Sequence, residues 1–492
     1  MTQISSSDTT MPQALAETLE GRLPVLPAQR LYAGFGSFMW TCSSLAAASW
    51  VYLIGSSLPS LGNTWLSIGG YTLGNFIGLT LVSLASGVPS FRYGVDTIDA
   101  SKSALGVRGS LVFLVTVLVS CIGWANVLIA LTARSAGTLA STLQTGGGVG
   151  PINEVIVVGA ALLLVGIGWW LSCKGPAMVS GLSRWCVPGQ MVLAVVLAGL
   201  LVAKYGVHQL LHTNVAPEKA VTQDHLTQLA LAIEFGVNNA LVMLPFFGGL
   251  TRLVKRRRHL VGPLVVGCGV IGALFLSGVA GLSASASGTS DPLVWINVIA
   301  GPWIGSIILL FMLVANIGAL VTLVYLAAIS IQQIGPLARL PWKVTVALVM
   351  APSLIVSFKT QPMLDHVMQL LTYNGVMFVG LTAVLLVDFF LLSGQAIAPS
   401  HLFTTSRHGR YWYSGGVNWV AMAVVVAATA LYLWMYNPIT LEVGEGFRYL
   451  GAGVPTIALA ATVYWLAMSI KRKLTRSTNR QVDPSARVEL RM

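Results

Sequence analysis

The stretch LALAIEFGVNNALVMLPFFGGLTR, residues 229–252, decides the fold class. It is long enough to cross the roughly 30 Å hydrocarbon core of a bilayer as a helix. However, Pro245 lacks the amide hydrogen that a helix needs, and its ring clashes with the preceding turn. Broken backbone within a membrane is tolerated only where it faces protein or a water-filled cavity. The stretch therefore predicts a discontinuous membrane helix, an element from which transporters build binding sites.

The composition places the rest of the chain in the membrane as well. Only 9% of the 492 residues are charged and the mean hydropathy is +0.78, whereas a soluble domain has about 25% charged residues. Because only helices satisfy their own backbone hydrogen bonds in lipid, each apolar window of about 20 residues predicts one spanning helix. Twelve such windows lie near 31–56, 64–87, 110–136, 152–172, 183–203, 226–252, 260–285, 303–334, 342–358, 366–394, 415–436 and 450–470.

Lysine and arginine occupy every second gap between these windows, which predicts the topology. Cytoplasmic loops keep positive charge because it resists translocation. By this count 23 of the 28 Lys and Arg residues lie on one side, so both termini are predicted to be cytoplasmic. The net charge of +12 is interpreted as a topology signal and as contacts with anionic membrane lipid, not as a nucleic-acid surface. The basic gaps are 92–108, 174–184, 252–258, 339–343 and 407–410.

Other motifs exclude several further classes. The five cysteines contain no CxxC pair, so they indicate neither a disulfide framework nor a metal site. No P-loop, HExxH or nucleophile elbow supports an enzyme, and no cofactor is predicted. Residues 1–25 lack the apolar core of a signal peptide, and we expect them and the tail after Lys473 to be disordered. Residues 292–300, which end at Gly301 and Pro302, predict a short helix.

Three glycines in the second window, Gly70, Gly74 and Gly78, recur every four residues. Small residues at this spacing leave a flat helix face, against which a second helix can pack closely. We interpret the three glycines as a packing face and not as a binding site.

Glu234 is the clearest ionisable residue well inside a predicted span. A charge at the centre of a membrane helix costs at least about 2.5 kcal/mol, so such a residue is a functional candidate by default. The neutral form that burial favours would suit a proton carrier. The alternative is a structural Glu234 that only forms hydrogen bonds with a neighbouring helix. Asp388 lies near the predicted cytoplasmic end of its window, where we interpret it as an anchoring or pairing residue.

Polar and aromatic residues in three other windows mark a candidate binding site. Trp124 lies near the middle of its window, followed by Asn126, and a flat indole facing a cavity could stack on a flat heterocycle. The run 41–49, rich in small and hydroxyl residues, could allow a second helix break. Asn316 is a polar residue at mid-depth in an otherwise apolar window. Ordinary core packing is the alternative for each of these features.

Several short motifs resemble the nucleobase–cation symporter-1 family, which includes the cytosine and purine permeases. They are FRYGV at 91–95, SALGVRGS at 103–110, Gly123-Trp124, PFFGGLTR at 245–252 and YSGGVNW at 413–419. Each is loose alone, but they occur in the family's order across about residues 30–470.

The resemblance implies an all-α membrane protein with a LeuT-like fold of about 12 transmembrane helices. Two inverted repeats of five helices would cover about residues 31–203 and 226–394, and two peripheral helices would cover 415–470. The transporter domain would then extend over 26–470, followed by a cytoplasmic tail at 471–492. Helices 1 and 6 would be broken, and the substrate would lie between helices 1, 3, 6 and 8, with Trp124 stacked on its ring.

The chain also departs from the family pattern. Leu128 stands where the family often has a polar residue, and Ala240 stands near the position of a second aromatic, so Phe235 or Phe246 would have to replace that ring. In sodium-coupled members, helix 8 supplies adjacent hydroxyl groups, but Gly318 and Ala319 fall near those positions. The oxygen atoms left for a weak sodium site are those of Asn316 and the carbonyls of residues 42–45, from Cys42 to Leu45. Proton coupling through Glu234 fits this loss.

The sequence therefore predicts a secondary active transporter in a bacterial inner membrane. It would import a purine, cytosine, hydantoin, allantoin or pyrimidine vitamin with a cation, and we expect a proton in preference to sodium. The alternative is a LeuT-fold carrier for another small solute, such as an amino acid. Amide side chains can both donate and accept hydrogen bonds at the edge of such a ring. The candidate amides are Asn126, Asn238, Asn239 and Asn316.

Overall fold

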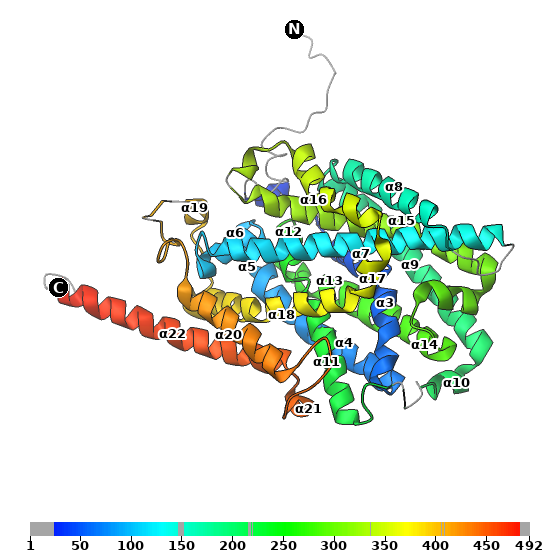
Figure 1. Cartoon of the computed structure of the whole chain (residues 1–492). Coiled ribbons are helices and arrows are strands. Elements are labelled where there is room, and N and C mark those ends of the chain that lie inside the picture. The colour runs from blue at the N-terminus through cyan, green and yellow to red at the C-terminus, as the bar shows by residue number, and fades with distance from the viewer. Residues whose placement is uncertain are drawn as a thin grey trace, which may run out of the picture.

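The computed structural model describes residues 24–145, 152–214, 218, 220–334, 336–404, 406–407 and 409–482. Within these residues every regular element is a helix (Figure 1). Eight helices are long and apolar enough to cross a membrane, two bent helix pairs also pass this test, and two apolar helices are shorter. Together they match the twelve predicted windows.

The spanning elements follow one another in the order of the windows. They are α2 (Phe35–Ala46) with α3 (Trp50–Ser57), α4 (Thr64–Val82) with η3 (Ser83–Gly87) and α5 (Val88–Tyr93), α7 (Ser110–Gln144), α8 (Glu154–Ser172), α9 (Pro176–Tyr205), α11 (His225–Leu241) with α12 (Leu244–Thr251), α13 (Val261–Leu264) with η6 (Val265–Leu276) and α14 (Ser277–Ser287), α15 (Pro292–Gln332), α16 (Trp342–Ser357), α18 (Val367–Leu386) with η8 (Val387–Leu392), α20 (Trp419–Met435) and α22 (Gly453–Val482).

Short helices connect these spans. They are η1 (Pro27–Gln29), η2 (Leu58–Leu61), α6 (Thr97–Leu105), α10 (Val207–Leu211), η5 (Arg257–His259), η7 (Leu337–Arg339), α17 (Thr360–Asp365), α19 (Pro399–Leu402) and α21 (Phe447–Leu450). Helix α22 continues to Val482, so the predicted disorder after Lys473 is wrong up to that residue. Residues 1–23 and 483–492, which the same prediction covered, lie outside the described residues.

Both predicted helix breaks are present. The first span bends by 62° between α2 and α3, and the sixth bends by 44° between α11 and α12. Pro245 lies in the first turn of α12, where its missing amide hydrogen leaves no helical bond unmade. Residues 292–300 are also helical as expected, and Gly301, with φ of +71°, separates them from the rest of α15.

Each broken span packs with the helix that follows the other broken span. Helix α4 packs along α11, η6 packs against α2 and α4, and α14 packs against α3. A second unit contains α7, α8, α15 and α16. Spans 1 and 2 thus pair with spans 6 and 7, and spans 3 and 4 pair with 8 and 9. This pairing at an offset of five spans is what two repeats of five helices produce.

The glycines of α4 form the predicted packing face. A Cβ atom built on Gly74 would lie 2.0 Å from the carbonyl oxygen of Ile233 in α11, and one built on Gly70 would lie 2.7 Å from the Cβ atom of Ala232. In return, a Cβ atom on Gly236 of α11 would lie 2.1 Å from the carbonyl oxygen of Tyr71. The two backbones are therefore in direct contact, which only glycine allows at these positions.

The predicted basic gaps meet at one end of the bundle, which we call the basic end. The amide of Arg108 donates to the carbonyl of Gly416, and the indole of Trp342 donates to the carbonyl of Ser172. A pocket of about 420 Å³ joins the loop before α7 to the loop after α15, and Lys102 and Arg108 line it.

Helices α20 and α22 lie side by side at the periphery (Figure 1).

Candidate functional site

The two broken spans face each other across a small central cavity. Its walls come from α2, α3, α4, α11 and η6, and Met243 at the second break completes it. Its volume of about 20 Å³ leaves room for about one water molecule. Small-molecule pockets typically measure about 300–1,000 Å³, so the site is closed in this conformation. The side chains that matter below are Leu45, Trp50, Tyr71, Asn75, Asn239 and Ala240.

Two indoles meet beside this cavity. The ring centroids of Trp50 and Trp124 are 5.2 Å apart, with the rings inclined at 74°, an edge-to-face pair. Trp124 is buried, and its Nε1 hydrogen has no bonding partner among the described residues. A buried indole donor normally finds an acceptor. Trp50 lines the central cavity, whereas Trp124 is not part of its wall and keeps an unused hydrogen-bond donor.

Asn316 joins the first break to two other helices. Its Nδ2 donates to Ser49 Oγ at 2.7 Å and to Thr132 Oγ1 at 2.8 Å, while its Oδ1 accepts from the Ser49 amide at 2.8 Å. Both amide hydrogens of Asn316 are thus in use, and the side chain is buried. The hydroxyl oxygens of Ser49 and Thr132 face a hydrogen-bond donor in this arrangement.

The other candidate amides lie in different surroundings. Asn239 donates to Asn75 Oδ1 at 3.0 Å, and this amide pair lines the central cavity. Asn238 points away from it and donates to the hydroxyl of Tyr432 in α20. Asn126 is buried in α7, and its Oδ1 has no partner within the described part of the chain.

The remaining ring and cation candidates are spread out. Phe235 and Phe246 are buried but do not line the cavity, so neither contributes a ring to it. Leu45 lines the cavity, while the carbonyl of Cys42 accepts a hydrogen bond from the thiol of Cys268. Ala319 is buried in α15. Among the described residues, no group of three or more His, Cys, Asp or Glu side chains could hold a metal ion.

The side chain of Glu234, a residue of α11, contacts the start of the last spanning helix, α22. Its Oε2 accepts the amides of Ala452 and Gly453, both at 2.9 Å, at the N-terminus of α22. The amide groups at a helix start carry partial positive charge and favour a carboxylate. Its Oε1 has no partner among the residues that the structure describes. The structure thus places Glu234 at an interface between α11 and α22 and not at the central cavity.

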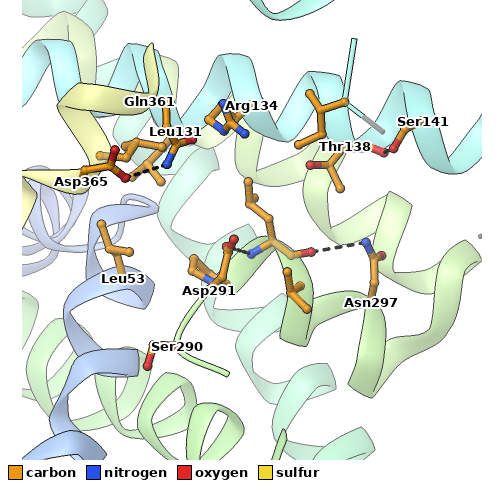
Figure 2. A pocket seen from close by; sticks show the side chains of 15 residues that line it. Leu53, Leu131, Arg134, Thr138, Ser141, Ser290, Asp291, Asn297, Gln361 and Asp365 are labelled. Carbon is orange, nitrogen blue, oxygen red and sulfur yellow. Dashed lines mark hydrogen bonds between the residues drawn. The ribbon is translucent and has the colours of Figure 1, made fainter. Parts of the chain in front are cut away.

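A larger pocket of about 420 Å³ lies at the end opposite the basic end (Figure 2). Arg134 and Thr138 of α7, Asp291 and Asn297 of α15 and Asp365 of α17 project around it. Two of its lining residues are close in sequence to residues described above. Leu53 lies one turn beyond Trp50, and Leu131 precedes Thr132. We call this pocket the access pocket.

A buried charge cluster occupies the basic end. Arg252 at the end of α12 is 1% exposed, and its Nε donates to the carbonyl of Gly249. Asp96 and Asp99 lie nearby in the loop between two spans, and Lys102 pairs with Asp99. Burial raises the pKa of Asp96 to about 6, although the Arg252 guanidinium opposes the rise. The cluster joins the second half of the sixth span to α6.

This pKa predicts a pH-dependent stability. The pKa of Asp96 is higher in the folded protein than its ordinary 3.8, so folding takes up a proton and stability falls as pH rises from about 4 to 6. The rise from 3.8 to about 6 corresponds to about 3 kcal/mol at most. We expect Asp96→Asn to lack this stabilisation at low pH. The melting temperature of wild type, relative to that of the variant, should therefore be higher at pH 4.5 than at pH 7. An unchanged difference between these pH values would contradict the assignment.

Some functional candidates carried no clear sequence signal. Trp50, Ser49 and Thr132 come together only through the first break, although the small-residue run that ends at Ser49 pointed to that break. Asn75 belongs to the glycine-rich second span, which the sequence marks for packing alone.

Comparison with known proteins agrees with this architecture. A family model described as permease for cytosine/purines, uracil, thiamine, allantoin matches residues 36–452. No curated protein matches the chain. Mhp1, a nucleobase-cation-symport-1 family transporter solved in a closed conformation with bromovinylhydantoin bound, shares 18% identity over 92% of this chain and 96% of its own, with a TM-score of 0.73.

Two further structures show the same fold. Mhp1 in an inward-facing conformation gives a TM-score of 0.69 at 17% identity, over 91% of this chain and 93% of that chain. A Na⁺-coupled sialic acid symporter in a substrate-bound outward-open state gives 0.59 at 14% identity, over 92% and 96%. At these identities the similarity shows the fold alone. The predicted LeuT-like fold and the predicted family resemblance are confirmed, and both the family and the fold are those of transporters.

Proposed function

This chain belongs to the family of permeases for cytosine/purines, uracil, thiamine and allantoin, and from that membership we propose that it imports a nucleobase or a related flat heterocycle together with a cation. The bound ring would be a purine, cytosine, a hydantoin or allantoin, or a pyrimidine vitamin. The observation that carries this proposal is the buried indole of Trp124, which stands beside the helix breaks with an unused N–H donor.

The proposed recognition uses ring stacking and amide hydrogen bonds together. Stacking of a base on an aromatic side chain is worth about 1–3 kcal/mol, whereas micromolar affinity needs about 8 kcal/mol. Hydrogen bonds to the ring edge must supply much of the rest. The Asn75–Asn239 pair lines the central cavity beside Trp50, and amide side chains can both donate and accept. Asn126 has an unpaired oxygen on the helix of Trp124.

The proposed mechanism is alternating access between the two ends of the bundle. One pocket of about 420 Å³ opens at each end, and the cavity between the broken spans is too small for a ring. The breaks allow each half-helix to move without unfolding its partner. Substrate would enter through the access pocket, and the site would close around it before the basic end opens.

The proposed orientation follows from charge. We assign the basic end to the cytoplasm, because loops rich in Lys and Arg resist translocation. Both termini are then cytoplasmic, and the membrane is a bacterial inner membrane. Anionic lipid would contact the basic loops, among them Lys255 and Arg256–Arg258, all four of which are exposed.

We propose a proton as the coupled cation. Sodium prefers several oxygen ligands, but the hydroxyls of Ser49 and Thr132 face the amide of Asn316, and Ala319 offers no side-chain oxygen. Glu234 is the proposed proton carrier, since it is buried within a span and its Oε1 has no partner among the described residues.

The Glu234→Gln variant tests this assignment. Glutamine keeps an oxygen that accepts the amides of Ala452 and Gly453, but it cannot take up a proton. We expect uptake into proteoliposomes to lose its response to an imposed pH gradient. Asp388→Asn, at the second buried acid of the spanning segments, serves as the matched control and should keep the response. An unaltered pH response in Glu234→Gln would leave the residue with only its role as the cap of α22.

The proposed function itself is tested by uptake in proteoliposomes. We expect saturable, concentrative uptake of at least one labelled compound among cytosine, adenine, uracil, thiamine and allantoin. The same uptake is then measured with an imposed sodium gradient in place of the proton gradient. Uptake of an amino acid instead would favour the alternative solute class, and non-saturable flux would contradict a carrier.

A further inference from the structure

The sixth span contributes no ring to the central cavity. Ala240 lines the cavity with a single methyl group, and Phe235 and Phe246 lie outside its wall. A flat heterocycle can interact with an aromatic side chain either by stacking on its face or through an edge-to-face contact. An aromatic contact in the cavity wall must therefore come from another element, and Trp124 is not part of that wall.

The first span supplies such a ring. Trp50 is the first residue of α3, directly after the break, and it is the aromatic side chain of the first span in the cavity wall. It is buried, and its ring lies 5.2 Å from that of Trp124. Trp50 thus contacts Trp124 with its ring and lines the same cavity as Ala240.

The position of Trp50 depends on the break that precedes it. Ser49 is bound to Asn316 both through its backbone amide and through its hydroxyl, and Asn316 also bonds to Thr132 on the helix of Trp124. One buried side chain therefore fixes the start of α3 relative to α7. A shift of the Ser49 backbone would move the neighbouring Trp50 ring away from Trp124.

We propose that Trp50 is the aromatic side chain through which the first span contacts the substrate ring, in place of a ring from the sixth span, and that Asn316 is the residue that positions it. This inference rests on the proposed function and names the side chain through which the first span recognises the substrate. Asn316 acts through Ser49 and keeps its own amide hydrogens engaged, so it sets the geometry of the site without contacting the substrate.

The consequence for specificity follows from the chemistry of stacking. A second indole stabilises aromatic rings such as cytosine and adenine more than it stabilises the non-aromatic ring of allantoin. Loss of Trp50 should therefore reduce the preference for aromatic rings. A general packing defect would weaken both kinds of ligand to the same extent.

The test is equilibrium binding of labelled cytosine, adenine and allantoin to the purified full-length protein. In Trp50→Ala we expect the Kd for the aromatic ligand to rise about 5- to 150-fold, with a smaller rise for allantoin. In Trp50→Phe most of the affinity should return. Trp303→Ala, which removes a tryptophan that is 69% exposed, is the control and should bind like wild type.

A double-mutant cycle then tests the role of Asn316. Asn316→Ala should weaken binding of the aromatic ligand, but it should add little in a Trp50→Ala background, because residues that act through one another are not additive. Full additivity would overturn the positioning role. Equal weakening of aromatic and non-aromatic ligands in Trp50→Ala, or no weakening, would overturn the role of Trp50. If the wild type binds no heterocycle at all, the proposed function fails first and this inference falls with it.

Discussion

Trp124→Ala is expected to weaken binding of a flat heterocycle by about 5- to 150-fold, the equivalent of about 1–3 kcal/mol of stacking. The indole is buried next to the first helix break, and its N–H has no partner among the described residues. Removing it takes away both the ring surface and the donor.

Binding is measured on the purified protein by titration with the labelled heterocycle. Trp124→Phe is the informative comparison, because it retains a ring but no donor, and it should fall between wild type and Trp124→Ala. A melting temperature close to that of wild type must accompany the loss, so that misfolding is excluded. Wild-type affinity in Trp124→Ala would remove this residue from the site.

Gly74→Ala is expected to prevent accumulation of folded protein, the largest stability effect that the structure indicates. The added Cβ atom would lie 2.0 Å from the carbonyl oxygen of Ile233, and this neighbour is backbone that cannot rotate away. Overpacking that a side chain can relieve costs about 1–3 kcal/mol. Here α4 and α11 must separate, which also opens the wall of the central cavity.

Gly69→Ala is the matched control on the same helix. A Cβ atom at this position meets nothing within 4 Å, so normal expression and melting are expected. Size-exclusion chromatography and thermal melting of detergent-purified protein compare the two variants. A stable, monodisperse Gly74→Ala protein would show that the α4–α11 contact is looser than described.

The sequence was sufficient for the features that depend on one segment at a time. Pro245 marked the sixth break, Gly301 marked the end of a short helix, and the glycines of α4 marked a packing face. Each follows from a local backbone property: a missing donor, a positive φ angle or a missing side chain. The positions of the apolar helices followed from hydropathy for the same reason.

The candidate site could be predicted only in part, because its contacts join distant segments. Trp124 was identifiable as a buried ring, but its contact with Trp50 depends on the 62° bend at the first break. Glu234 stood out as an acid in a span, yet its amide partners are about 218 residues away along the chain. No periodicity within a window indicates such pairings.

The most direct test of the central claim is thermal stabilisation of the purified full-length protein by a ligand panel. A ligand that binds only the folded state raises its stability in proportion to its affinity and concentration. The panel contains cytosine, adenine, uracil, thiamine, allantoin and L-phenylalanine, each with and without sodium. We predict that at least one heterocycle raises the melting temperature, without need of sodium, and that the rise is lost in Trp124→Ala. Stabilisation by L-phenylalanine alone, or a heterocycle effect that persists without Trp124, would contradict the account.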